Sequence, residues 1–452
     1  MDHTKQMGTA PILKLVIKFS LPTIFAMVVN AIYNIVDRIF VGHFVNEDAL
    51  GGLTVVFPIM IIILAFGTLF AIGGAVLISI KLGENKLDEA TMYFGNTVSL
   101  IVIGSAVMSA VSIIFLPDLL LLSGATPSNL PYALSYMHII LPCVIIQLSS
   151  FAMAAIVRSE GKPYFAMISQ VSSALTNIVL DYIFIGPLNM GVEGAAIATV
   201  IGQFVGFAIL FRYFFIKKQG ILRLNANSLK LSAARFGRIC VTGASSFVIN
   251  IGTGISASFT NAALAVYGGD AAITSAGAIS SIFTLVLMPV LGLLQGIGPI
   301  MGYNHGMRQP SRVWRTLFTG IGLGSVFTAA MFILIQIFPE TAASLFLKPS
   351  SPTMAMCAHG LKLNLTALPV LAFSVLSTAY FQSTGRGLIS LSISLLRQLL
   401  VIAAVKTLPY YLALDGVWLS SPAGEILTVA LSACLLIAAA RTKRPASIAD
   451  EA

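Results

Sequence analysis

Long apolar runs recur along the chain, separated by short segments that contain charged residues, glycine and proline. A helix needs about 20 mostly apolar residues to cross a bilayer core, and a spanning backbone must satisfy its own hydrogen bonds. The runs lack the alternation of apolar and polar residues that marks the strands of a membrane β-barrel; residues 59–64, for example, are all apolar. The pattern predicts an all-α polytopic membrane protein with twelve transmembrane helices, over residues 13–41, 52–80, 92–116, 132–157, 164–185, 191–215, 239–266, 271–303, 316–338, 360–384, 388–410 and 416–440.

The positions of the basic residues predict how the chain is oriented, because Lys and Arg favour cytoplasmic loops. With both termini cytoplasmic, only Lys348 and Lys362 fall in loops on the outer side, and Arg38, Arg397 and Lys406 lie within spans, which leaves 21 of the 26 basic residues inside. A missed or extra helix would destroy this asymmetry. We therefore expect a multi-pass protein of a bacterial or archaeal cytoplasmic membrane, whose first apolar run is retained as a helix rather than cleaved as a signal.

Composition narrows the function further. The chain is 57% hydrophobic and 10% charged, whereas soluble domains are roughly 25% charged. This excludes a soluble enzyme, a disordered chain and a nucleic-acid-binding domain, and the net charge of +9 is explained by the cytoplasmic loops. The four cysteines lie far apart and indicate neither a disulfide framework nor a metal site.

The two halves of the chain resemble each other at an offset of 223 to 224 residues. Ala49 corresponds to Ala272 and Gly73 to Gly296, and the SEGK stretch at 159–162 corresponds to STGR at 383–386. Because each half has an even number of spans, the repeats are parallel and related by a pseudo-twofold axis along the membrane normal. We expect a first six-helix lobe over residues 1–216, a cytoplasmic linker over 217–238 and a second six-helix lobe over 239–452. Two such lobes with a cleft between them suit alternating access.

Two acidic residues lie inside predicted spans, where a charge costs at least about 2.5 kcal/mol and usually marks function. They are Asp37 on the first span and Asp181 on the fifth, both in the outer part of the first lobe, so that they can share one cavity. The other acids are expected in loops or at helix ends: Asp48, Glu84, Asp88, Glu89, Asp118, Glu193, Asp270, Glu340, Asp415 and Glu425.

Polar residues accompany these acids at helical spacing, so that they share a helix face. These residues are Tyr33 and Asn34 before Asp37, Gln170 and Asn177 before Asp181, and Thr199 and Gln203 on the sixth span. The residues expected to line the substrate cavity are Tyr33, Asn34, Gln170 and Gln203. Taken singly, an Asn or Thr in a span is as often explained by hydrogen bonding between helices as by a functional role. The structural alternative for Asp37 is an ion pair with Arg38. Together, the oxygens predict a coupling site for H⁺ or Na⁺ at Asp37, Asn177, Asp181 and Thr199, with no other cofactor or metal.

The second half lacks this arrangement. At the repeat offset Asp37 corresponds to Thr260 and Asp181 to Val405. The only charges expected in its spans are Arg397 and Lys406, which could face the cleft or interact with helix ends and lipid. Pro22 removes a backbone hydrogen bond from the first helix and is predicted to allow bending there.

Several stretches resemble the multidrug and toxic compound extrusion (MATE) family over essentially the whole chain. They are NAIYNIVDRIFVGHF, VRSEGKPYFAMISQVSSALTNIVLDYIFI, GVEGAAIATVIGQ and STGRGLISLSISLLRQ followed by LDGVW. The resemblance implies a twelve-helix, two-lobed exporter of cationic, amphipathic drugs and dyes, driven by H⁺ or Na⁺. Pro22 matches a first-helix proline whose bending has been proposed to assist coupling.

The pattern resembles the DinF-like branch, whose acids lie in the first lobe. Its functional positions correspond to Tyr33, Asp37, Asn177, Asp181 and Thr199. The NorM-like branch instead has acids on the seventh and tenth helices, where this chain has Asn250, Asn261 and Asn364.

These observations predict a monomeric secondary active multidrug antiporter, not an enzyme, that is embedded in a lipid bilayer and exports amphipathic small molecules, with H⁺ favoured over Na⁺. The alternative within transport is a flippase for lipid-linked or polysaccharide substrates of the same superfamily. A remote alternative is an intramembrane aspartyl protease, although its GxGD motif is approached only by YGGD at 267–270. No GxxxxGK[ST] loop is present in the sequence, so ATP does not drive the process.

Overall fold

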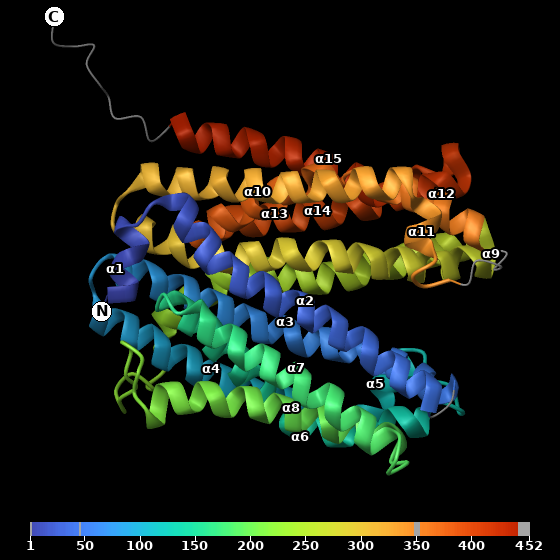
Figure 1. Ribbon diagram of the computed structural model, residues 1–452, viewed down its shortest axis with the longest axis horizontal. Coiled ribbons are helices and arrows are strands. Elements are labelled where there is room, and N and C mark those ends of the chain that lie inside the picture. The colour runs from blue at the N-terminus through green and yellow to red at the C-terminus, as the bar shows by residue number, and fades with distance from the viewer. Residues whose placement is uncertain (1, 45–46, 348–352, 442–452) are drawn as a thin grey trace, which may run out of the picture.

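A computed structural model describes residues 2–44, 47–347 and 353–441 of the protein, and every regular element in these ranges is helical. Figure 1 shows the helices lying lengthwise beside one another, with the chain running from blue to red. Their bounds are α1 Asp2–Thr9, α2 Ile12–Phe44, α3 Glu47–Gly83, α4 Leu87–Ile114, α5 Leu116–Leu122, α6 Leu130–Ser159, α7 Pro163–Ile185, α8 Gly191–Phe211, the π-helix η1 Arg212–Ile216, α9 Ala233–Gly306, α10 Pro310–Ile337, α11 Pro339–Ala343, α12 Met354–Asn364, α13 Leu368–Ser383, α14 Gly387–Thr407 and α15 Pro409–Arg441.

Twelve membrane spans follow from these helices. Ten are long and apolar enough to cross a bilayer, and α12 and α13, bent by 49°, form one more broken span. The 74-residue α9 contains two helices joined at Gly269, where φ is 61°, a conformation that glycine adopts without steric cost. Counting its two arms separately, and including the broken pair, gives twelve spans within the described residues and confirms the predicted all-α architecture.

The spans form two six-helix lobes, and the two described chain ends lie at the same end of the molecule (Figure 1). In the first lobe are α2–α8, and in the second are α9–α15. The lobes are close at this end and diverge toward the other, where α2 and the turn of α9 lie well apart (Figure 1). We call these the terminal end and the distal end.

Closely packed glycines join the lobes on the terminal side. A Cβ atom added to Gly243 of α9 would lie 1.8 Å from the carbonyl oxygen of Leu69 on α3, and one added to Gly73 would lie 2.2 Å from that of Ile239. Thr23 of α2 also donates a hydrogen bond of 2.7 Å to the carbonyl of Gly292. Small residues let helix backbones approach each other, which is how helices associate in lipid.

The short helix at the start of the chain bridges the lobes at the terminal end. Thr4 of α1 donates a hydrogen bond to the carbonyl of Glu160 in the first lobe. In the second lobe, Asn304 donates to the carbonyl of Met7, and Arg312 donates to the carbonyls of Met7 and Ala10. α1 therefore fastens both lobes where they are closest.

Large apolar side chains on the outer surfaces of both lobes are exposed, which suits contact with lipid. Leu122 is 86% exposed and Val326 73% exposed. In a soluble protein such side chains would be mostly buried, so this surface supports a membrane location.

Candidate functional site

The first lobe buries a carboxylate among polar side chains near its distal end. Asp181 on α7 is completely buried, and Asn177, one turn earlier, is almost so. Asn177 donates a hydrogen bond of 3.3 Å from Nδ2 to Oγ1 of Thr199 on α8. The three residues meet because α7 and α8 pack against each other along their length, with Gly202 allowing a close approach to Asn177.

The second acid of this site comes from α2, which packs against α7. Asp37 is partly buried and lies close enough to Asp181 for their charges to interact. Tyr33, one turn earlier on α2, interacts with both carboxylates. The structure thus brings Asp37 and Asp181 into one site, which we call the acid site.

Tyr136 on α6 is a member of the acid site that the sequence analysis missed. Its side chain contacts Thr199 and interacts electrostatically with Asp37 and Asp181. Tyr132 and Tyr136 are four residues apart at the distal end of their span, at the depth of the two acids. This spacing was the available signal, but a tyrosine at a membrane interface is common and carries little information alone.

Three buried oxygens on α7 lack hydrogen-bond donors among the described residues. Within the described residues, neither oxygen of Asp181 nor Oδ1 of Asn177 has a hydrogen-bond partner of good geometry. Asn177 lies close enough to Asp181 to interact with its carboxylate, but its amide nitrogen is directed to Thr199. A buried acceptor without a donor is costly, and a bound proton or an oxygen-preferring cation would remove that cost.

The remaining predicted positions lie further away or are not described. Gln170 and Gln203 are partly buried on α7 and α8, but Gln170 is eleven residues before Asp181, about 16 Å along the helix. The side chains of Asn34 and Arg38 lie outside the described residues. Pro22 lies within α2, which is helical from Ile12 to Phe44, and its neighbour Thr23 makes the bond to the second lobe described above.

In the second lobe the structure corrects the prediction for Glu425. We expected this residue at a helix end, but it lies inside α15 and is 5% exposed. Its Oε2 forms an ion pair of 2.7 Å with Nε of Arg397 on α14. The expectation that Arg397 and Lys406 are the only charges in these spans was therefore wrong. Lys406 is exposed and lies 4.9 Å from the ring centre of Phe259.

Arg158 also differs from its predicted place in a cytoplasmic loop. It is the penultimate residue of α6 and is 4% exposed. No signal in the sequence distinguished it from the basic residues of the loops, because its burial depends on how the helices around it pack.

The acid site does not have the composition of a transition-metal centre. No group of three or more His, Cys, Asp or Glu side chains converges in the part of the chain that the structure describes. Two carboxylates with amide and hydroxyl oxygens suit a hard cation such as Na⁺, or a proton.

Comparison with known proteins identifies the family. The MatE family model matches residues 22–183 and again residues 246–405, so the two matches begin 224 residues apart. The chain belongs to the MatE family. The double match coincides with the repeat found in the sequence, and the family consists of membrane transporters rather than enzymes.

Individual relatives agree with this assignment. Multidrug export protein MepA of Staphylococcus aureus is 27% identical over 438 residues, which cover 95% of this chain and 94% of MepA. The MATE multidrug transporter DinF-BH, solved in complex with rhodamine 6G, is 33% identical with a TM-score of 0.88 and covers 95% of this chain and 96% of its own. A transporter of the MOP superfamily from Pyrococcus furiosus has the same fold, with a TM-score of 0.92 at 22% identity over 97% of this chain and 98% of its own.

Proposed function

We propose that this MatE-family chain is a secondary active antiporter that exports amphipathic organic cations and is driven by H⁺, or alternatively Na⁺, entering at the acid site. The observation that carries the proposal is Asp181, a completely buried carboxylate with no hydrogen-bond donor of good geometry and a second carboxylate, Asp37, beside it. Such a group is costly inside a membrane protein and usually has a functional role.

The chemistry of coupling follows from the charges. Two neighbouring carboxylates repel each other, and this repulsion is strong where water is scarce. One added positive charge relieves it, either as a proton on Asp181 or as Na⁺ held by Asp37, Asp181, Asn177 and Thr199. Loading and unloading the acid site thereby changes the free energy of packing α2 against α7.

The two lobes supply the movement. They are fastened at the terminal end and diverge at the distal end (Figure 1). The acid site lies toward the distal end, because Asp181 is in the last turns of α7. The basic loops favour a cytoplasmic position for the terminal end, and in this orientation the acid site faces the outer side. In this scheme a cation enters from outside, changes the helix packing and favours release of the substrate.

The relatives support the substrate class. MepA is named as a multidrug export protein, and DinF-BH is a multidrug transporter solved with rhodamine 6G. Both matches cover 95% of this chain, together with 94% of MepA and 96% of DinF-BH.

The proposal is tested by dye efflux into inverted membrane vesicles under a pH gradient or a Na⁺ gradient applied separately. Vesicles with wild-type protein should accumulate a cationic rhodamine ester under one of the two gradients. Vesicles with the Asp37→Asn or Asp181→Asn variant should not accumulate it. Asp118→Asn is the matched control, because Asp118 is an exposed acid near the same end of the first lobe. Full accumulation by both acid-site variants under either gradient would show that coupling takes place elsewhere.

A further inference from the structure

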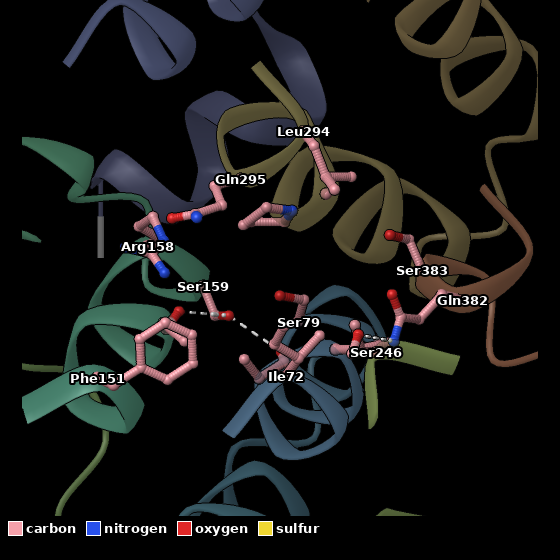
Figure 2. A pocket seen from close by; sticks show the side chains of 15 residues that line it. Ile72, Ser79, Phe151, Arg158, Ser159, Ser246, Leu294, Gln295, Gln382 and Ser383 are labelled. Carbon is pink, nitrogen blue, oxygen red and sulfur yellow. Dashed lines mark hydrogen bonds between the residues drawn. The ribbon is translucent and has the colours of Figure 1, made fainter. Parts of the chain in front are cut away.

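A cavity lies between the lobes on the terminal side and has an empty volume of about 620 Å³, which includes the open solvent at its mouth. Figure 2 shows it between helices of both lobes, with Arg158 and Phe151 on one side, Gln382 and Ser383 on the other, and the Gln295 side chain reaching toward Arg158. It is distinct from the acid site. Arg158 lies 22 residues after Tyr136 on α6, which is about 33 Å along the helix.

Arg158 is the one charged group that lines this cavity among the described residues. It is 4% exposed, and its Nη1 has no hydrogen-bond partner in the described part of the chain. None of the ion pairs in these ranges includes it. A buried guanidinium without a counter-charge is costly, so an anion is the group that this position favours.

The nearest acid in the sequence does not neutralise Arg158. Glu160 is turned toward the linker, where Tyr213 donates a hydrogen bond of 2.7 Å to Oε2 and the backbone N–H of Leu222 donates one of 2.8 Å to Oε1. Its carboxylate is therefore already occupied. The positive charge of Arg158 remains available to a molecule in the cavity.

Two further polar atoms of the cavity also lack partners. They are Oγ of Ser79 and Oε1 of Gln295, both buried without a hydrogen bond within the described residues. Ser79 can donate to an anion, and Gln295 can accept from an N–H group. Figure 2 shows the Arg158 guanidinium and the Gln295 amide reaching into the cavity from different helices.

The rest of the wall is mainly apolar, with Ile72, Phe151, Leu294 and Pro299 among the lining residues. Such a surface suits a flat hydrophobic molecule rather than a free inorganic anion. We propose that this cavity is an entry site for amphipathic substrates that carry a carboxylate, and that Arg158 binds this carboxylate. The inference rests on the proposed export function and extends its substrate class from cations to molecules that also carry an anionic group.

Rhodamine B and its ethyl ester provide a direct test, because they share one cationic ring system and differ in a free carboxylate. Binding of each dye to purified protein in detergent is measured by fluorescence polarisation for wild type, Arg158→Gln and Arg158→Lys. A charge-assisted hydrogen bond contributes about 1.5–3 kcal/mol, so Arg158→Gln should weaken rhodamine B binding by roughly tenfold or more. The ester should bind equally to all three proteins, and Arg158→Lys should retain most of the affinity for rhodamine B.

Two results would overturn the assignment. Equal weakening of both dyes by Arg158→Gln would mean that Arg158 only supports the fold, and unchanged binding of both would mean that it does not contact the substrate. Thermal melting of each variant is recorded alongside, and the lysine variant preserves the charge if the glutamine variant is unstable.

A lipid headgroup is the other source of an anion, and a competition arm separates it from a substrate. If phosphatidylglycerol displaced rhodamine B from wild type but left the ester bound, the site would belong to a lipid phosphate and the substrate assignment would fail.

Equilibrium binding needs no ion gradient, so this test is independent of the proposed export function. A protein that binds rhodamine B through Arg158 but exports neither dye would therefore contradict the proposed function and leave this site intact.

Discussion

In the first lobe, the completely buried Asp181 has no cationic partner among the described residues and lies beside a second acid, Asp37. In the second lobe, the nearly buried Glu425 is paired with Arg397 at 2.7 Å. Both lobes have six spans and the same family match, yet among the described residues only the second lobe pairs its buried acid with a cationic side chain. The difference teaches that burial of an acid does not by itself favour the binding of a cation, because a fixed counter-charge removes the cost of the buried carboxylate.

The largest expected effect comes from breaking the pair in the second lobe. Arg397→Met leaves Glu425 buried and unpaired and should destabilise the protein by about 3 kcal/mol, the low end for a buried pair because Arg397 is 25% exposed. Replacing both residues with methionine should restore most of the loss. The measurement is a double-mutant cycle of the free energy of unfolding in detergent. If the double variant lost as much stability as Arg397→Met alone, the cost would not come from leaving Glu425 unpaired.

The matched change in the first lobe should have the opposite profile. Asp181→Asn removes a costly charge, so melting should be unchanged or raised, while ion-driven dye efflux should fall by about 100-fold, or ~2.7 kcal/mol. Glu425→Gln should retain efflux per folded molecule. A melting temperature lowered by Asp181→Asn with efflux preserved would reverse the comparison between the lobes.

A smaller effect is expected where the lobes touch each other. In Gly243→Ala the new methyl group would lie 1.8 Å from the carbonyl oxygen of Leu69, so the lobes must separate at the terminal end, at a cost of about 1–3 kcal/mol. The distance between two spin labels, one on each lobe at the terminal end, should therefore be longer in Gly243→Ala than in wild type. Gly254→Ala is the control on the same helix, because nothing lies within 4 Å of an added Cβ. If the distance between the spin labels were the same in both variants, the lobes would not be closely packed at Gly243.

The smallest effect concerns pH and the linker. Burial raises the pKa of Glu160 above its ordinary value, although hydrogen bonds from Leu222 and Tyr213 oppose this. Because the folded state then holds a proton that the unfolded state has released, stability is full below the ordinary pKa and falls as pH rises through the raised one. The melting temperature should therefore fall as the pH rises above the ordinary glutamate pKa of roughly 4.3, and melting curves recorded across this range measure the loss. Glu160→Gln should flatten this dependence, and an unchanged slope would assign it to other groups.

Much of the architecture was predictable because a bilayer imposes it. A spanning helix needs a long apolar run whatever its neighbours are, so the twelve spans and the repeat could be predicted from the sequence. The break of α9 at Gly269 was predicted only as a boundary between two runs. The common depth of Asp37 and Asp181 followed from counting turns along two helices, but the contribution of Tyr136 required knowing how α6 packs beside them.

The sequence by itself determined that this chain crosses a membrane, that its halves correspond and that two acids lie at one depth in the first half. These properties depend on hydropathy, spacing and periodicity, which are local along the chain. Only the tertiary structure decided which charges have partners: Glu425 acquires Arg397 from a neighbouring helix, whereas Arg158 is buried without a counter-charge among the described residues. The reason is physical, since the free energy of a buried charge depends on what surrounds it in space and not on its neighbours in sequence.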